Sequence, residues 1–383
     1  MKNRSTSTNT IITYSIIVLV LVVLKILTAD QFHLFDFMGE NEMKIFNYIV
    51  NAILQIGILF CGAVFLFKVF QKAKLKEIFK FYGFKKISWK GVGYSILLGI
   101  IVYILNVFVA SFFSLLLREL GYSYGQSSMT SYPVWLFFIN IVTACILPAI
   151  CEETLHRGML IKGLSGYGMK KAIIISSLLF GLMHMNIEQF FYTTLIGLFL
   201  GLLTSKCDCI IPAMIVHFMN NFLSTFMQFS SMNNLGVEGV FTFINTSFAN
   251  NPMVALLFVI TLIVLLLILA KTLVRKITEE SMLKQMHSLQ DALIKELMRG
   301  EFFAGLEEFV KLGEGEEDKF KKEDIHQLVH KRSLEYGITD EITDSIILEG
   351  DTAKPSTFAR VLLVCSFVLM GIVTLISFII GVL

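Results

Sequence analysis

The sequence predicts an all-α protein: a polytopic membrane helical bundle of about eight or nine transmembrane helices with a small cytoplasmic α-helical insert. Of its 383 residues, 55% are hydrophobic and only 16% are charged, whereas soluble domains carry about 25% charged residues. The mean hydropathy is +0.72. Apolar runs long enough for the roughly 30 Å hydrocarbon core recur along the chain. The lipid bilayer is therefore its first expected partner, and no nucleic acid is expected.

The predicted spans follow one another from the N-terminus. The first, 10–27, is interpreted as an anchor, because it is long and no small-residue cleavage site follows it as in a signal peptide. The others are 45–70, 91–117, 133–150, 172–184, 190–204, 210–229, 253–270 and 361–383. The fifth and sixth are short, so we expect a helical hairpin or tilted core helices there and predict eight or nine spans.

Basic residues set the expected orientation. Residues 72–90 contain seven lysines, whereas 230–252 contain no Lys or Arg. Loops rich in Lys and Arg stay in the cytoplasm. We therefore predict a multi-pass protein of the cell membrane with a cytoplasmic N-terminus and, with nine spans, an outside C-terminus. The endoplasmic reticulum membrane is the alternative.

One sizeable soluble part, 271–360, separates the last two spans. It contains 14 Lys and Arg and 19 Asp and Glu, so it is an acidic insert in a basic membrane protein. Helices are predicted over 277–312 and 324–336 from the apolar spacing. The insert is expected to recruit a substrate or protein partner, to dimerise, or to regulate access. The predicted divisions are 1–132 (first three spans and basic loop), 133–229 (catalytic core), 230–270 (outside loop and span), 271–360 (insert) and 361–383 (last span).

A polar cluster directly follows the apolar run 133–150. Glu152, Glu153, His156 and Arg157 lie within seven residues, and ionised groups at membrane depth are costly. Residues four apart share a helical face, so Glu153 is expected to pair with Arg157, and Glu152 to stack with His156. Glu152 would then remain free for chemistry.

Three more polar residues lie in the following spans. His184 ends one of them, and His217 and Asn221 share a face of the next. With Glu152 they supply a general base, a second base or ligand, and donors for an oxyanion, which peptide hydrolysis by an activated water requires. The alternative is a purely structural role, in which each His forms a hydrogen bond with a neighbouring carbonyl inside the bundle. A transporter is a third interpretation, since intramembrane Glu and His also form proton relays, but we see no inverted repeat.

These residues resemble a known family. Glu152-Glu153-xxx-Arg157, Phe180-xxx-His184 and His217-xxx-Asn221 are similar to the three motifs of the CPBP (CAAX protease and bacteriocin-processing, or Abi) intramembrane endopeptidases. These are related to the Ras-converting type II CAAX prenyl endopeptidase. The resemblance covers about 133–229. It implies a hydrolase that cleaves a peptide bond in a hydrophobic or lipidated peptide or membrane-protein substrate. The alternative is a non-proteolytic membrane scaffold or a bacteriocin-immunity or signalling protein with the same fold.

The resemblance also implies a role for each matching residue. Glu152 and His184 would activate the attacking water, and His217 and Asn221 would stabilise the tetrahedral oxyanion. His156 occupies a free position of the motif and receives no catalytic role. The residues that would support the site are Glu153, Arg157 and Phe180.

The dependence on a metal stays open at the level of the sequence. Glu152, His184 and His217 are three residues that could ligate zinc and leave a fourth position for water. No HExxH motif requires this interpretation. We favour a glutamate-dependent mechanism that requires no cofactor, with a metalloendopeptidase as the alternative.

Overall fold

The computed structural model describes residues 6–27, 40–123, 132–236, 252–298 and 355–382, and every regular element within these ranges is a helix. All nine predicted spans are helical. The elements are α1 (Thr6–Leu27), α2 (Glu40–Ile53), η2 (Leu54–Phe60), α3 (Cys61–Gln71), α4 (Leu75–Phe81), α5 (Trp89–Glu119), α6 (Val134–Asn140), η3 (Ile141–Ile146), α7 (Leu147–Glu153), η4 (Thr154–Ile161), α8 (Lys162–Leu164), η5 (Ser165–Tyr167), α9 (Met169–Met183), α10 (Ile187–Cys207), α11 (Ile211–Met232), α13 (Pro252–Met298) and α17 (Thr357–Val382).

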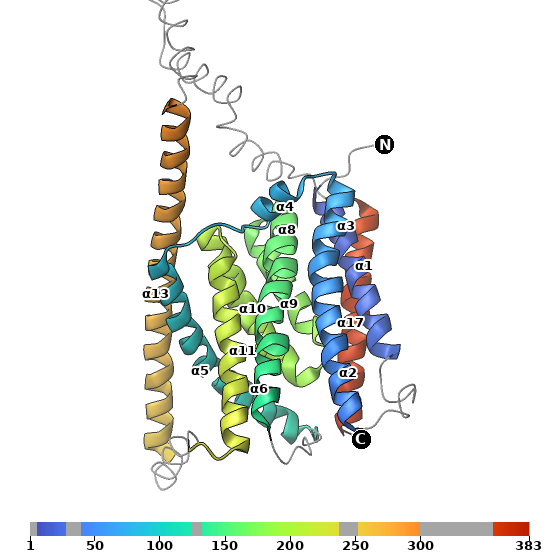
Figure 1. The fold of residues 1–383 in the computed structure, drawn as a ribbon. Coiled ribbons are helices and arrows are strands. Elements are labelled where there is room, and N and C mark those ends of the chain that lie inside the picture. Colours follow the sequence, from blue (N-terminus) through green and yellow to red (C-terminus); the bar gives the residue numbers. More distant parts are fainter. Residues whose placement is uncertain (1–5, 28–39, 124–131, 237–251, 299–354, 383) are drawn as a thin grey trace, which may run out of the picture.

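Seven helices of the described chain are long and apolar enough to cross a membrane. They form an upright bundle in which the two chain ends lie at opposite ends (Figure 1). The predicted fifth span is α9, which has only 15 residues, and it packs against α10 as a hairpin. The seventh predicted span, α11, has 22 residues but is not among the seven. The polytopic helical bundle predicted from composition is thus confirmed.

Two of the predicted spans contain π-helical turns. The stretch 40–71 contains η2, and the stretch 134–167 contains η3 and η4. A π-helix pairs each N–H with the carbonyl five residues earlier, so its turns are wider than those of an α-helix, and such turns are frequent at functional sites. All three segments lie close to the polar cluster, and η4 begins directly after Glu153.

The predicted eighth span and the first predicted helix of the insert are joined within the described residues. The structure has one uninterrupted helix, α13, of 47 residues from Pro252 to Met298, where the sequence predicted a span over 253–270 and a separate helix over 277–312. No Gly or Pro interrupts the sequence between them, so nothing ends the helix when it leaves the apolar region. The predicted helix over 324–336 lies outside the described residues.

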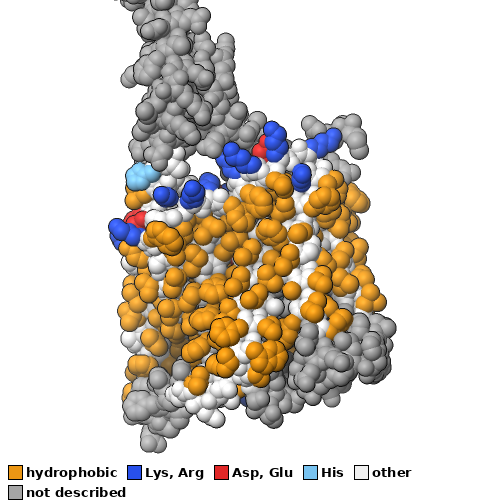
Figure 2. All heavy atoms as spheres, in the orientation of Figure 1, with side chains coloured by type: hydrophobic (Ala, Val, Ile, Leu, Met, Phe, Trp, Pro, Cys, Tyr) orange, Lys and Arg blue, Asp and Glu red, His pale blue; other side chains and the backbone are white. Residues whose placement is uncertain are grey.

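The surface of the bundle divides into an apolar belt and a basic end. Large hydrophobic side chains cover the visible flank, and Lys and Arg side chains gather at the end that carries α4 and the α13 extension (Figure 2). Phe65 and Leu257 are more than half exposed. Such an exposed apolar surface suits contact with lipid, because the bilayer core around a membrane protein consists of apolar lipid tails.

Asp208 links segments of the chain at the basic end of the bundle. It follows α10 in the left-handed conformation and forms ion pairs with Lys85 and Lys162. Burial raises the pKa of Asp208, but the two ammonium groups lower it more, so its pKa lies below the usual 3.8. The ionised carboxylate therefore holds three segments of the chain: the loop before α5, the start of α8, and the α10–α11 turn.

We expect the Asp208→Asn variant to be modestly less stable than wild type at neutral pH, by about 1 kcal/mol or less, since the Asp208 side chain is 47% exposed and solvent screens the pairs. A carboxyl with a lowered folded-state pKa stabilises the fold above its unfolded pKa and loses this contribution as the pH falls through the folded value. Thermal unfolding in detergent should show a constant gap between the two proteins above about pH 5, and the gap should close as the pH falls through the folded-state pKa of Asp208. A gap that does not change with pH would contradict the assignment.

Candidate active site

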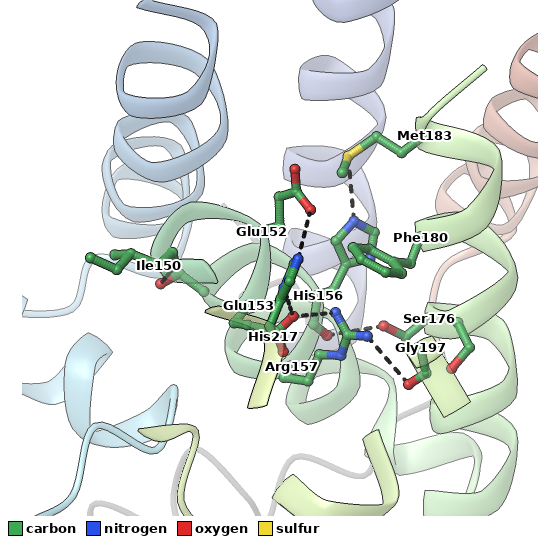
Figure 3. Close-up of polar contacts among 12 residues, drawn as sticks. Ile150, Glu152, Glu153, His156, Arg157, Ser176, Phe180, Met183, Gly197 and His217 are labelled. Atoms are coloured by element: carbon green, nitrogen blue, oxygen red, sulfur yellow. Dashed lines mark hydrogen bonds and ion pairs between the residues drawn. The ribbon is translucent and has the colours of Figure 1, made fainter. Parts of the chain in front are cut away.

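The polar cluster lies where α7 passes into η4, in the interior of the bundle. Glu152 and Glu153 are the last two residues of α7, and His156 and Arg157 lie in the first turn of η4. Their exposed fractions are 7%, 0%, 0% and 1% in that order. Figure 3 shows that this segment faces α9 and α11. Four ionisable groups are thus buried together at membrane depth, as the sequence predicted.

Glu153 is the acceptor at the centre of this cluster. Its Oε1 lies 2.8 Å from Arg157 Nη1 and 2.8 Å from His217 Nδ1. The predicted Glu153–Arg157 ion pair is therefore present. Because a carboxylate only accepts hydrogen bonds, His217 carries a proton on Nδ1 and turns its Nε2 away from Glu153. This Nε2 lies 3.9 Å from Glu152 Oε2 (Figure 3).

Arg157 makes two further contacts besides its ion pair with Glu153. Its guanidinium carbon lies 4.3 Å from the centre of the Phe180 ring, and Nη2 donates to the Gly197 carbonyl at 3.3 Å. The approach of α10 depends on that glycine, because a Cβ at Gly197 would lie 3.1 Å from the Cα of Ser177. Phe180 also makes edge contacts with the rings of His184 and His217, so it packs the site as predicted.

His184 sits at the turn between α9 and α10. Its Nδ1 lies 2.9 Å from the Phe180 carbonyl, and because a carbonyl only accepts, Nδ1 is the donor and Nε2 is left with a lone pair. The next residue, Met185, has a left-handed backbone with φ of 51°. Asn186 then caps α10 by accepting from the N–H groups of Glu188 and Gln189. A strained non-glycine turn beside a catalytic candidate is a common feature of functional sites.

Glu152 and His184 share one cavity. It has a volume of about 250 Å³ and lies between α1, the α2–η2 region, α7 and the α9–α10 turn. Most of its other lining is apolar, including Leu21, Leu54 and Met183. The cavity therefore offers a carboxylate and an imidazole to an otherwise hydrophobic guest.

The structure does not place Asn221 in this cavity. Its amide donates to the Ala144 carbonyl at 3.0 Å and accepts from Asn220 at 3.1 Å. It lines a second cavity of about 370 Å³ between α5, α10 and α11. Asn221 lies one turn beyond His217 on α11, so the two share a face as predicted, while only His217 faces Glu152 in the described contacts.

The predicted stacking of Glu152 with His156 is wrong. His156 Nε2 contacts the sulfur of Met183 at 3.4 Å, and the ring packs edge-on against Tyr14. His156 does not line the cavity that Glu152 lines. Its exclusion from catalysis is a prediction that rests on the resemblance alone.

The three predicted zinc ligands are Glu152, His184 and His217. Within the described part of the chain, no group of three or more His, Cys, Asp and Glu side chains is close enough to hold a metal ion. Glu152 lies 3.9 Å from His217 Nε2 and shares a cavity with His184.

Three polar residues of the cavity were not singled out from the sequence: Lys25, Asn51 and Gln55. Lys25 of α1 donates to the His184 carbonyl at 3.2 Å, and Gln55 of η2 is 7% exposed. All three line the cavity with Glu152. A signal for Lys25 exists, because it is the only charged residue in the first apolar run 10–27. Its distance of 159 residues from His184 hides the contact from any local pattern.

Residues 133–223 match the family model described as Rce1-like, type II CAAX prenyl endopeptidase Rce1-like. Comparisons with curated proteins and with solved structures found no match. The matched range contains the α7–η4 cluster, the α9–α10 turn and the part of α11 that carries His217 and Asn221. The range also nearly coincides with the core predicted over 133–229. The chain is thus similar, over residues 133–223, to the Rce1-like family of type II CAAX prenyl endopeptidases.

Proposed function

We propose that the protein is an intramembrane endopeptidase that hydrolyses a peptide bond in a hydrophobic or lipidated substrate. The observation that carries the proposal is the shared cavity of Glu152 and His184, with His217 Nε2 3.9 Å from Glu152. A scaffold has no need of a costly carboxylate pair at membrane depth. The family match supports protease chemistry for this domain.

Glu152 and His184 would hold the attacking water. His184 offers the lone pair of Nε2, because Nδ1 is committed to the Phe180 carbonyl. Glu152 would take a proton from the water as its oxygen attacks the carbonyl carbon of the substrate, and would then pass that proton to the leaving amine. The C–N bond breaks, and a carboxylic acid and an amine leave the cavity. Such general acid–base catalysis contributes about 10²–10⁴-fold in rate.

His217 would stabilise the oxyanion. Since Glu153 fixes the proton of His217 on Nδ1, His217 donates from Nε2 only when its ring is doubly protonated. Asn221 would be the second donor that the resemblance implies; in this structure its amide donates to the Ala144 carbonyl and lines the neighbouring cavity.

The role of Asn221 gives a prediction. Asn221→Ala is expected to lower kcat by about 10²–10³-fold with little change in KM, as for other single oxyanion donors. Ser224→Ala, which alters the same 370 Å³ cavity, is the matched control and should keep near wild-type kcat. Steady-state cleavage kinetics measure both. Equal, small effects of the two variants would assign Asn221 to packing against Ala144.

We further propose that the reaction needs no metal. The support is the absence of a three-residue ligand cluster in the described ranges. We place the basic end of the bundle in the cytoplasm of the cell, since Lys and Arg gather there (Figure 2). The N-terminus lies at this end (Figure 1).

A cleavage assay in liposomes tests the proposal. Wild type and Glu152→Ala are compared on a pool of prenylated, otherwise lipidated and unlipidated hydrophobic peptides, with products identified by mass spectrometry, in the presence and absence of EDTA. Products from wild type alone, with or without EDTA, are the expected result. Equal cleavage by both proteins would contradict the role of Glu152 as the general base. Loss of products in the presence of EDTA would support the metal-dependent mechanism instead. No products from either would favour the scaffold alternative.

A further inference from the structure

The larger of the two cavities lies where α5, α10 and α11 pack against one another (Figure 1). Its volume of about 370 Å³ falls within the range of small-molecule sites, about 300–1,000 Å³. Glu152 and His184 line the smaller cavity, and no residue lines both. Apart from Asn221, the residues that line the larger cavity have no part in the proposed peptide hydrolysis.

The lining of this larger cavity is polar but uncharged. Seven of its ten residues carry a hydroxyl or an amide, among them Tyr103, Asn106, Asn220 and Ser224, and none of the ten is Asp, Glu, Lys, Arg or His. Such a lining offers no counter-ion to a phosphate, a carboxylate or an ammonium group. Removing a charged group from water without a partner costs several kcal/mol or more. The cavity is therefore suited to a neutral ligand that forms hydrogen bonds.

Three asparagines form a chain of hydrogen bonds along the cavity wall. Asn106 Nδ2 donates to Asn220 Oδ1 at 3.4 Å, and Asn220 Nδ2 donates to Asn221 Oδ1 at 3.1 Å. In the described contacts, Asn106 Oδ1 and the hydroxyls of Tyr103 and Ser224 have no hydrogen-bond partner. An amide oxygen accepts, and a hydroxyl both donates and accepts. A ligand with a hydroxyl and carbonyl groups would therefore find a partner for each of them.

The cavity opens at the depth of the lipid tails. The helix α11 runs along the length of the bundle (Figure 1), and Ser224, an exposed residue of the lining, lies about 20 Å after its start and about 12 Å before its end. A water-soluble ligand would have to cross hydrocarbon to reach this opening. A membrane lipid reaches it directly, and a lipid with a neutral head loses less hydration at that depth than one with a charged head.

We propose that this cavity binds the head of a neutral glycerolipid, a diacylglycerol, while the acyl chains remain in the bilayer. The free glycerol hydroxyl would donate to Asn106 Oδ1, and the two ester carbonyls would accept from the hydroxyls of Tyr103 and Ser224. A fatty alcohol would leave both of these hydroxyls without an acceptor. The site is separate from the cavity of Glu152, so binding of the lipid does not depend on the proposed peptidase function.

The experiment uses the full chain in phosphatidylcholine liposomes and a diacylglycerol probe with a photoactivatable diazirine near the glycerol end of one acyl chain. After irradiation, mass spectrometry is expected to find the label on α5 or α11 beside the cavity. Unlabelled dioleoylglycerol should displace the probe, whereas dioleoylphosphatidic acid, which has the same chains and a charged head, should not. Oleyl alcohol should displace it only weakly. Equal displacement by dioleoylglycerol and dioleoylphosphatidic acid, or no saturable labelling, would refute the proposal.

Two variants locate the site. Asn106→Leu keeps the size of the side chain but removes the acceptor, and should weaken binding of the probe by about 3–10-fold, the value of one neutral hydrogen bond. Ser224→Leu should weaken it at least as much, because it narrows the opening and removes a donor. Ser231→Leu is the matched control, an exposed serine of α11 outside the lining, and should bind as wild type does. Unchanged labelling of Asn106→Leu and Ser224→Leu would show that the probe lies elsewhere. Displacement by an unlipidated hydrophobic peptide, and not by dioleoylglycerol, would assign the cavity to peptide instead. None of these measurements requires cleavage.

Discussion

Glu152→Gln is expected to lower kcat by about 10²–10⁴-fold with little change in KM or fold. Glutamine keeps the size and polarity of the side chain but accepts no proton at neutral pH, so the water loses its base. Among the described residues Glu152 makes no hydrogen bond that the amide would break, and it lies 3.9 Å from His217 Nε2. Single-turnover cleavage in liposomes separates the chemical step from binding.

Glu119→Gln serves as the control for this variant. Glu119 is an exposed carboxylate at the end of α5, far along the chain from the site, and its replacement removes the same charge. Its cleavage rate should equal that of wild type. A Glu152→Gln protein that binds substrate normally and still cleaves at the wild-type rate would move the role of base to another residue.

Arg157→Met is expected to destabilise the protein by about 3–5 kcal/mol, the cost of leaving one partner of a buried ion pair uncompensated. Glu153 would keep a buried negative charge with His217 as its remaining partner in the described contacts. The loss also removes the guanidinium from the Phe180 ring and from the Gly197 carbonyl. Unfolding in a graded detergent titration measures the free energy.

The double variant Glu153→Gln/Arg157→Met tests the cause. Removing both charges leaves none uncompensated, so the double variant should be more stable than Arg157→Met alone, by a coupling of about 0.5–3 kcal/mol. Additive losses would show that packing against Phe180, and not the ion pair, accounts for the effect. Arg275→Met is the control, because its pair with Glu279 is exposed and should change stability by less than about 1 kcal/mol.

Hydropathy and local spacing predicted the helices well, because in a bilayer an apolar run of sufficient length has few alternatives to a helix. They did not predict η2, η3 and η4, since a π-turn differs from an α-turn by one residue of pairing and leaves no mark on composition. The same approach placed a boundary inside α13, where a change from apolar to amphipathic sequence looked like the end of a helix. The composition changes at that point, but the helix continues.

In the candidate site, too, local spacing predicted some features and missed others. The Glu153–Arg157 pair follows from a spacing of four and is present in the structure. The contact between Lys25 and His184 joins residues 159 apart, and the unused acceptor of Gln55 depends on which helices surround it, so neither follows from a local pattern. Asn221 shares a helical face with His217, yet one helical turn is enough to place it in a different cavity.

The uninterrupted helix α13 has a mechanical consequence. At 1.5 Å per residue its 47 residues extend about 70 Å, more than twice the thickness of the hydrocarbon core. Near the surface it is fastened by Ser88 to Glu280, at 2.6 Å, and by Gln285 to the Cys207 carbonyl, at 3.1 Å. A tilt of its outer arm would therefore act on α5 and α10, which are two of the three helices that border the cavity of Asn221.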